Sequence, residues 1–290
     1  LLDGLDFDVS QAEEETVVME GKIDTQILST LEQSETVDVI IRLKDKVPME
    51  DLFKSAASLS SKGDRGKMVV QALQSFTSNS QQGLLTQLGA LEKEGKVSNV
   101  KQFWVFNGVA ATVTKEALAL IEARADVEKI TLDFEVYVPE VEVEETKPRL
   151  PEWGVEKINA PDVWGTYGIE GNGVVVGIMD TGVDWQHEAL RKNYRGKDGN
   201  HEFSWFDATG YGYEMPTDRN GHGTHVAGTA VGGGDGEPIG VAPGAEWIAA
   251  KIFDDGGRAT ASGIHEAFQW FMAPGGDPDM APDVVNNSWG

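Results

Sequence analysis

The 290-residue sequence contains no cysteine, no long apolar run and few basic residues. The lack of cysteine excludes disulfides and thiol chemistry, although it leaves the compartment open because many exported proteins have no disulfides. The sequence has 24 Lys and Arg residues but 48 Asp and Glu residues. The resulting net charge of −24 disfavours nucleic acid and anionic membranes as partners. No run approaches the roughly 20 apolar residues that span a bilayer, so we expect no membrane insertion.

The first half of the chain alternates between strand and helix patterns after a polar, acidic lead-in. Residues 1–36 hold few aromatic side chains, so we predict poor order there. The predicted elements that follow are a strand at 37–43, a helix at 67–91 with Gly83 as a weak point, strands at 100–106 and 108–113, a short helix capped by Thr114, and a strand at 127–132. This order is that of a ferredoxin-like α+β sandwich, which we assign to residues 37–135.

A linker joins this unit to the second half of the chain. Residues 136–150 are rich in Val and Glu, include Pro139 and Pro148, and lack helical periodicity. We therefore expect an extended linker there, followed by a separate domain at residues 151–290.

Two motifs in the second half carry chemistry. The apolar residues 174–179 stop at Asp180-Thr181-Gly182, a pattern typical of a buried parallel strand, and reactive groups collect beyond the carboxyl ends of such strands. Further along, His222 lies at the start of a glycine-rich segment that predicts a helix. A carboxylate that accepts the Nδ1 proton of a histidine leaves Nε2 free to take a proton from a hydroxyl nucleophile. We therefore predict that Asp180 orients His222 as a general base.

The Asp-Thr-Gly and His-Gly-Thr-His-Val-Ala-Gly-Thr blocks resemble those of the subtilisin family of serine proteases, in the family's order. The resemblance is nearly continuous from Trp153 to Gly290, and Asn-Asn-Ser-Trp-Gly resembles the bacillopeptidase F branch of the family. It implies an α/β fold with a subtilisin-like parallel-sheet catalytic domain, here its N-terminal part, behind a ferredoxin-like α+β inhibitory prodomain.

The same resemblance implies a function. It is that of a secreted serine-type endopeptidase acting on protein or peptide substrates, with Asp180 and His222 as two members of the catalytic triad and a signal peptide outside this sequence. Two segments would bind the substrate backbone on either side of a cleft. They are Ser288-Trp289-Gly290 and Gly257-Arg258-Ala259. The chain's own prodomain would end in this cleft as an extended strand, with the processing site between about Val138 and Leu150.

The block that carries the family's catalytic serine, Gly-Thr-Ser-Met, does not occur in the sequence, and the oxyanion-hole asparagine has no counterpart either. We therefore expect an N-terminal part of a precursor that is inactive alone. One competing interpretation is that the prodomain is the functional part, as a protease inhibitor and intramolecular folding chaperone. Another is a non-catalytic relative that never had the serine.

The other histidines favour structural roles. His222 and His225 with Asp180 could form a zinc site, but zinc-protease signatures place two histidines four residues apart with a glutamate between them. We expect His225 to be a packed structural residue and His265 to be a surface or helix residue.

The chemistry requires no cofactor, and calcium enters only as a structural ion. Family members hold such an ion with an aspartate at the position of Ala189 here. Asp235 and Glu237 are the weak candidates that remain for an altered calcium site.

Overall fold

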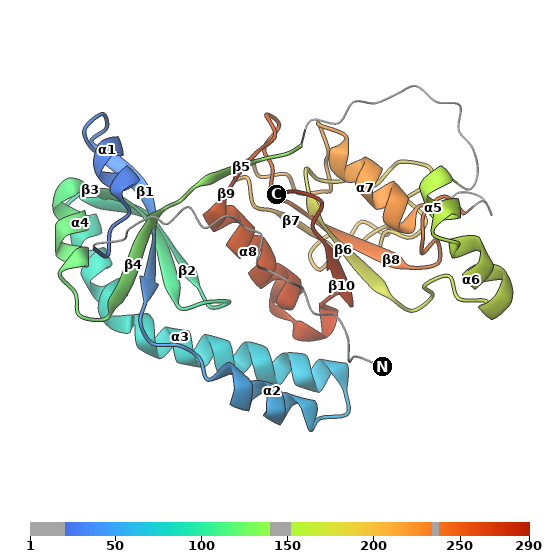
Figure 1. The fold of residues 1–290 in the computed structure, drawn as a ribbon, viewed down its shortest axis with the longest axis horizontal. Coiled ribbons are helices and arrows are strands. Elements are labelled where there is room, and N and C mark those ends of the chain that lie inside the picture. Colours follow the sequence, from blue (N-terminus) through green and yellow to red (C-terminus); the bar gives the residue numbers. More distant parts are fainter. Residues whose placement is uncertain (1–20, 140–151, 234–237) are drawn as a thin grey trace.

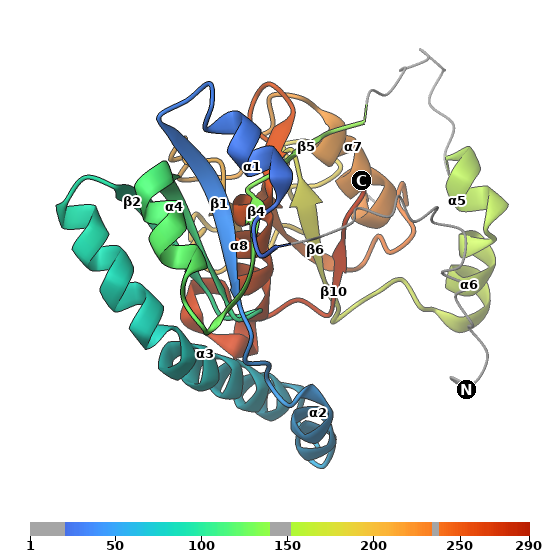
Figure 2. The same ribbon diagram turned by 60° about the vertical axis from the view of Figure 1, so that its left-hand side comes forward.

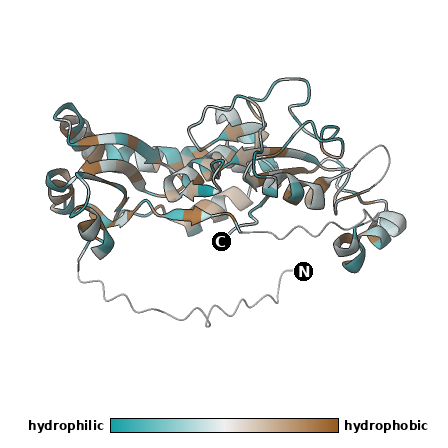
Figure 3. Ribbon diagram, turned by 90° about the horizontal axis from the view of Figure 1, so that it is seen from above, coloured by the Kyte–Doolittle hydropathy of each residue, from teal (hydrophilic) through white to brown (hydrophobic). Residues whose placement is uncertain are grey.

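The computed structural model describes residues 21–139, 152–233 and 238–290, which form two domains placed side by side (Figure 1). Each domain has its own sheet and its own hydrophobic core. Apolar residues concentrate along the strands and on the helices that cover them (Figure 3).

The N-terminal domain is an antiparallel sheet with two helices on one face. Its strands are β1 (Thr36–Leu43), β2 (Val97–Phe103), β3 (Gly108–Thr114) and β4 (Val127–Leu132), in the spatial order β2-β3-β1-β4. The covering helices are α3 (Lys62–Lys93) and α4 (Lys115–Glu122). Alternate residues of β1, such as Val39 and Ile41, share a core with Leu88 of α3 and Ile121 of α4. The predicted ferredoxin-like α+β sandwich is confirmed.

Two short helices lie in segments where no helix was predicted, α1 (Thr25–Thr30) and α2 (Met49–Ala57). Asp24 caps α1 by accepting a hydrogen bond from the backbone N–H of Gln26 at 3.1 Å, and Ile27 is fully buried in the core of the domain. The predicted poor order of residues 1–36 is therefore wrong from residue 21 onward, while residues 1–20 lie outside the described part. Helix α1 has only six residues, too few for its apolar residues to show a helical period.

Helix α3 continues unbroken through Gly83, where a weak point was predicted. A Cβ atom at this position would lie 3.1 Å from Nη2 of Arg124, whose Nη1 donates to the carbonyl oxygen of Gly83 at 3.3 Å. The glycine therefore makes room for the Arg124 guanidinium to pack against the helix.

The second domain is built on a parallel sheet with helices on both faces. Its strands are β6 (Val175–Asp180), β7 (Trp205–Asp207), β8 (Glu246–Lys251) and β10 (Val284–Asn286), in the order β10-β6-β8-β7. The helices are α5 (Trp153–Lys157), α6 (Ala160–Tyr167), α7 (His222–Val231) and α8 (Ala261–Met272). Ala227 of α7 packs with Ile178 of β6, whereas Phe271 of α8 packs with Met179, so α7 and α8 lie on opposite faces. The predicted parallel-sheet α/β domain is confirmed.

Helix α8 is shared by the two domains, because its other side meets the free face of the N-terminal sheet (Figures 1 and 2). Ile40, Phe103 and Ala110 from that face form an apolar cluster with Ala261 at the start of α8. Strands β1 and β3 are therefore buried on both faces.

Polar contacts surround this apolar cluster. The Asp133 carboxylate accepts a hydrogen bond from the backbone N–H of Ser262 at 2.8 Å and so helps to cap α8 from the other domain. Ion pairs between the domains include Lys101 with Glu266, Lys62 with Asp283, and Lys67 with Asp279. Two of these contacts, from Asp133 and Lys101, reach α8 itself, and the other two reach the segment that follows it.

His265 lies in the middle of this interface. Its ring centroid is 5.4 Å from that of Phe103 and 4.5 Å from that of Phe106. Burial lowers the pKa of His265, the positive charge of Arg42 lowers it further, and the carboxylate of Asp133 acts in the opposite direction. The interface therefore favours the neutral imidazole.

The burial of Ile27 predicts a stability effect. Replacing Ile27 by Ala should lower the free energy of unfolding by about 2–4 kcal/mol, because the side chain is completely buried in the core. Leu28→Ala is the matched control, since Leu28 is 49% exposed. Urea titration followed by circular dichroism measures both. Equal effects of the two substitutions would show that α1 is not part of the cooperative core.

The lowered pKa of His265 predicts a pH effect of defined sign. The folded chain binds this proton less readily than an unfolded chain, so the stabilisation is present above the ordinary pKa of 6.5 and is lost as the pH falls through that value toward the lowered one. The melting temperature should fall between pH 7.5 and 5.5, and less so in His265→Gln. The exposed His225 serves as the control, and a His225→Gln variant should keep the wild-type pH dependence. An unchanged pH dependence in His265→Gln would contradict the prediction.

Candidate active site

Asp180 is the last residue of β6 and is fully buried. Its Oδ1 accepts a hydrogen bond from the backbone N–H of Thr181 at 2.7 Å. Burial raises the pKa of Asp180 above its ordinary value, while the hydrogen bonds from His222 and from the Thr181 N–H act in the opposite direction. Oδ2 of Asp180 has no hydrogen-bond partner in the part of the chain that the structure describes.

His222 is the first residue of α7, and its Nδ1 lies 2.7 Å from Oδ1 of Asp180. Because a carboxylate oxygen can only accept, this contact places the proton of a neutral imidazole on Nδ1 and leaves Nε2 as the basic nitrogen. The structure thus brings together the two residues that were predicted to form a pair.

Two glycines allow α7 to approach the end of β6 so closely. A Cβ atom at Gly223 would stand 2.1 Å from the carbonyl oxygen of Gly182, and one at Gly182 would stand 2.0 Å from the carbonyl oxygen of Thr217. Gly182 also has a φ of 105°, which side-chain-bearing residues rarely adopt. Both motifs therefore need glycine for the Asp180–His222 contact to form.

Asp218 connects the two motifs through its carboxylate. Oδ1 accepts from the Thr181 hydroxyl at 3.0 Å and from the backbone N–H groups of Asn220 and Gly221 at 3.0 and 2.9 Å. Oδ2 accepts from the backbone N–H and the hydroxyl of Thr224 at 3.0 and 2.6 Å. Gly221 precedes α7 and has no side chain to cap it, so Asp218 takes that role.

Thr181 completes the connection between the strand and the helix. Its hydroxyl donates to Asp218 and accepts from the backbone N–H of Gly223 at 2.8 Å. The buried Lys251 donates to the carbonyl oxygen of Thr181 at 2.8 Å and lies 3.3 Å from Asp255. The sequence analysis missed Asp218 and Lys251, although an aspartate shortly before a glycine-led helix start was a usable capping signal.

A strand from the N-terminal domain lies across the predicted substrate-binding segment at 257–259. Strand β5 (Glu135–Tyr137) pairs antiparallel with β9 (Arg258–Thr260), with Val136 opposite Ala259. The N–H of Val138 donates to the carbonyl oxygen of Gly257 at 2.9 Å. A Cβ atom at Gly257 would stand 2.7 Å from Val138 and 3.9 Å from Nδ2 of Asn220, so the end of this strand lies near the residues that precede His222.

The other predicted wall of the cleft does not pair with β5 among the described residues. Trp289 instead donates its Nε1–H to the carbonyl oxygen of Met179 at 2.8 Å and packs edge-on against Phe253. The Ser288 hydroxyl accepts from the Asn286 side chain at 2.8 Å, and Gly290 is exposed. The predicted role of Ser288, Trp289 and Gly290 in binding a substrate backbone stays a prediction.

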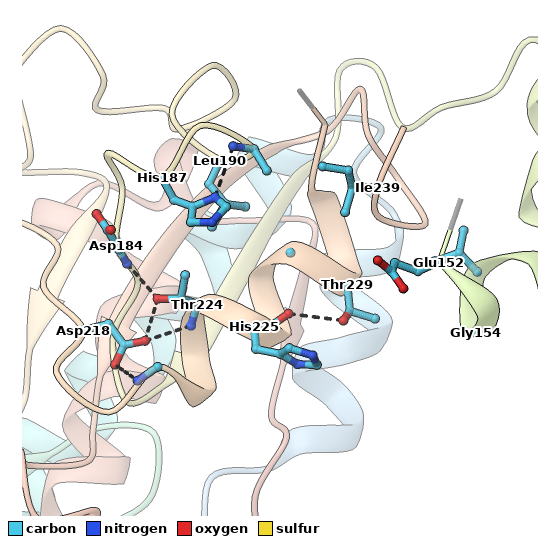
Figure 4. Close-up of a pocket in the computed structure, with 14 residues that line it drawn as sticks. Glu152, Gly154, Asp184, His187, Leu190, Asp218, Thr224, His225, Thr229 and Ile239 are labelled. Atoms are coloured by element: carbon cyan, nitrogen blue, oxygen red, sulfur yellow. Dashed lines mark hydrogen bonds between the residues drawn. The ribbon is translucent and has the colours of Figure 1, made fainter. Parts of the chain in front are cut away.

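His225 is exposed, so the expectation of a packed structural histidine is wrong. It lines a cavity of about 700 Å³ together with Asp184, His187 and Thr229, whereas neither Asp180 nor His222 contributes to that cavity (Figure 4). Among residues 21–139, 152–233 and 238–290, no group of His, Asp and Glu side chains is arranged to hold a metal ion.

The calcium candidates Asp235 and Glu237 lie outside the described residues, so a calcium ion there stays a prediction. Ala189 lies on the wall of the cavity and offers no side-chain oxygen.

Comparisons with known proteins agree with this arrangement. Residues 171–290 match the family described as the subtilase family, and residues 38–139 match the family described as peptidase inhibitor I9. The chain is 34% identical to bacillopeptidase F of Bacillus subtilis (strain 168), over 94% of this chain and 21% of that protein. It is 31% identical to subtilisin-like protease 7 of Trichophyton equinum, over 63% of this chain and 42% of that protein.

A solved structure supports the fold. The epidermin leader peptide processing serine protease of Staphylococcus aureus superposes with a TM-score of 0.52 at 18% identity, covering 87% of this chain and 50% of that chain. The chain therefore spans half of that structure, and about a fifth and two fifths of the two relatives in sequence.

The network around Asp218 predicts how the site responds to mutation. In Asp218→Asn, the amide nitrogen cannot accept a hydrogen bond, so some of the N–H groups at the start of α7 lose their acceptor. The start of the helix then moves more freely, and the His222–Asp180 contact loosens. The Nδ1 proton of His222 should exchange with water roughly tenfold faster or more, as expected for the loss of a hydrogen bond to a charged acceptor. Nuclear magnetic resonance of ¹⁵N-labelled histidine measures this rate.

Asp207→Asn is the matched control for this experiment. Asp207 accepts hydrogen bonds from Thr209 and from the backbone N–H of Tyr213 in a similar turn, without contacting Asp180 or His222. Equal exchange rates in the two variants would contradict a role of Asp218 in positioning His222.

Proposed function

The chain belongs to the subtilase family through residues 171–290 and to the inhibitor I9 family through residues 38–139, and from this we propose that it forms the acid–base half of a serine endopeptidase together with the inhibitory domain of its precursor. One observation carries the proposal. It is the 2.7 Å contact between Asp180 and His222 at the carboxyl end of a parallel strand, with a peptide strand bound nearby on β9.

In the proposed reaction His222 works through Nε2. It takes the proton of a serine hydroxyl as the oxygen attacks the peptide carbonyl carbon, and it later gives that proton to the leaving amine. The serine becomes acylated, and water then hydrolyses the ester by the same proton transfers in the second half of the cycle. Asp180 holds the tautomer and stabilises the imidazolium that forms in each half.

The attacking serine is not assigned to any residue of this chain. No Gly-Thr-Ser-Met block occurs in the 290 residues, so we propose that these residues alone do not turn over peptides. In this proposal Asp180 and His222 supply only the movement and stabilisation of the proton.

The N-terminal domain is proposed to act as the inhibitor of this site. Its β5 adds to β9 by main-chain hydrogen bonds, which is how an extended peptide adds to a sheet edge. Val136 and Val138 pack against an apolar cluster that includes Phe253 and Ala259. An intramolecular folding chaperone must also contact the domain that it helps to fold, and this domain does so through β9 and α8.

Location and partners follow from the same proposal. We propose export from the cell and proteins or peptides as substrates, in line with the relatives. Within the described ranges no helix has the length and apolar character to cross a membrane.

A chimera tests the catalytic proposal. Residues 21–290 would replace the matching segment of bacillopeptidase F, and hydrolysis of a peptide ester would be measured before and after His222→Ala. We expect a loss of turnover of about 10⁶-fold, the cost measured for the catalytic histidine of subtilisin itself. His225→Ala is the matched control on the same helix and should retain activity.

Other outcomes of this experiment separate the candidate functions. A folded chimera whose activity survives His222→Ala refutes the catalytic role of His222. An inactive chimera, combined with tight inhibition of bacillopeptidase F by residues 21–139 in trans, favours the inhibitory domain as the functional part.

A further inference from the structure

The strand bound on β9 carries a charged contact that the proposed reaction does not use. We propose that Arg258 makes this cleft selective for an acidic side chain at the strand position that Glu135 occupies. The inference rests on the proposed function, in which the cleft binds extended peptides. It adds a substrate class, namely peptides with Asp or Glu three residues before the residue whose N–H donates to Gly257.

The two faces of the bound strand meet different surroundings. Val136 and Val138 point toward the apolar cluster that contains Phe253, Ala259 and Trp289. The residues between and before them lie on the other face, as the two-residue period of a strand requires. On that face Tyr137 is directly opposite Arg258, and Glu135 is its diagonal neighbour within reach of a long side chain.

Arg258 uses its position to bind the Glu135 carboxylate. Nη1 of Arg258 lies 3.0 Å from Oε1 of Glu135, and Oε2 of Glu135 accepts a hydrogen bond from the Tyr137 hydroxyl at 2.8 Å. Both carboxylate oxygens of the strand residue are therefore bonded. A glutamine there offers one acceptor, and a lysine would present a positive charge to the guanidinium.

Asp254 holds Arg258 in place and leaves little room for a cation. Its Oδ2 lies 3.3 Å from Nε of Arg258, and its Oδ1 accepts from the backbone N–H groups of Gly256 and Arg258. The Asp254 side chain is only 15% exposed. Both oxygens of Asp254 thus already accept from donors of its own loop. A lysine at the position of Glu135 would therefore be repelled by Arg258 and would find no free carboxylate at Asp254.

The strength of the selection is modest, because the Arg258 and Glu135 side chains are 52% and 40% exposed. Exposed ion pairs contribute little, so we expect a preference of about twofold to fivefold for Glu over Gln and about tenfold for Glu over Lys at low salt. The preference should fade at 1 M salt, where the screening length is about 3 Å.

The experiment uses the whole chain and needs no hydrolysis. Amide hydrogen exchange at Val138 and Ala261 reports opening of the strand, because these N–H groups donate to Gly257 and Phe134 across the pairing. The variants are Glu135→Gln, Glu135→Lys, Arg258→Glu and the double variant Glu135→Lys with Arg258→Glu. The single charge reversals should accelerate exchange at both amides by about tenfold. The double variant should exchange more slowly than either single variant, because it restores the attraction between positions 135 and 258 although the contact with Asp254 is lost.

Glu128→Lys reverses a charge in the Lys46–Glu128 pair of the same domain and should leave exchange at Val138 unchanged. Exchange in the double variant equal to the combined effects of the single variants, at low and high salt alike, would falsify the selection by Arg258. A folded chimera whose activity survives His222→Ala, alongside slower exchange in the double variant than in either single variant, would refute the proposed catalysis and leave the charge selection standing.

Discussion

The carboxylate of Asp218 is the interaction on which the site depends. It accepts five hydrogen bonds from the turn after β6 and from the segment that begins α7. A helix that begins with a glycine cap has unpaired N–H groups, and these are the groups that Asp218 satisfies. The glycines at 182 and 223 remove the side chains that would keep the strand and the helix apart. The distance from Asp180 to His222 is therefore set by backbone positions that a neighbouring carboxylate fixes.

The sequence predicted the parts of the structure that local pattern controls. Strands β1, β4 and β6 were readable from apolar alternation or apolar runs, and the cap at Thr114 from residue type. Asp180 and His222 could be predicted because each lies in a short motif. The glycines of these motifs are needed where the strand and the helix approach each other. Such features depend on neighbours within a few residues, and the order of elements then leaves few ways to assemble a ferredoxin-like sandwich.

The features that were missed depend on contacts between distant segments. His265 is half-buried only because Phe103 and Phe106 arrive from the other domain, and His225 is exposed because nothing in the described chain covers its side of α7. Trp289, whose contact with a substrate stays a prediction, also anchors its own segment to β6, and the sequence did not reveal this contact. No local pattern states which side of a helix another domain will cover, so burial at these positions could not be predicted.

The short connection between β4 and β5 has a consequence for how long the cleft stays filled. Asp133 and Phe134 alone separate the two strands, and Asp133 is itself bonded to the start of α8. The bound strand is therefore presented by a domain that is docked independently through α8 and the lysine contacts of α3. Cutting the chain after β5 would leave the strand at a millimolar effective concentration, about that of a short tether. Under the proposed function, occupancy of the β9 edge would then depend on the avidity of two linked surfaces, and release would require the whole domain to dissociate.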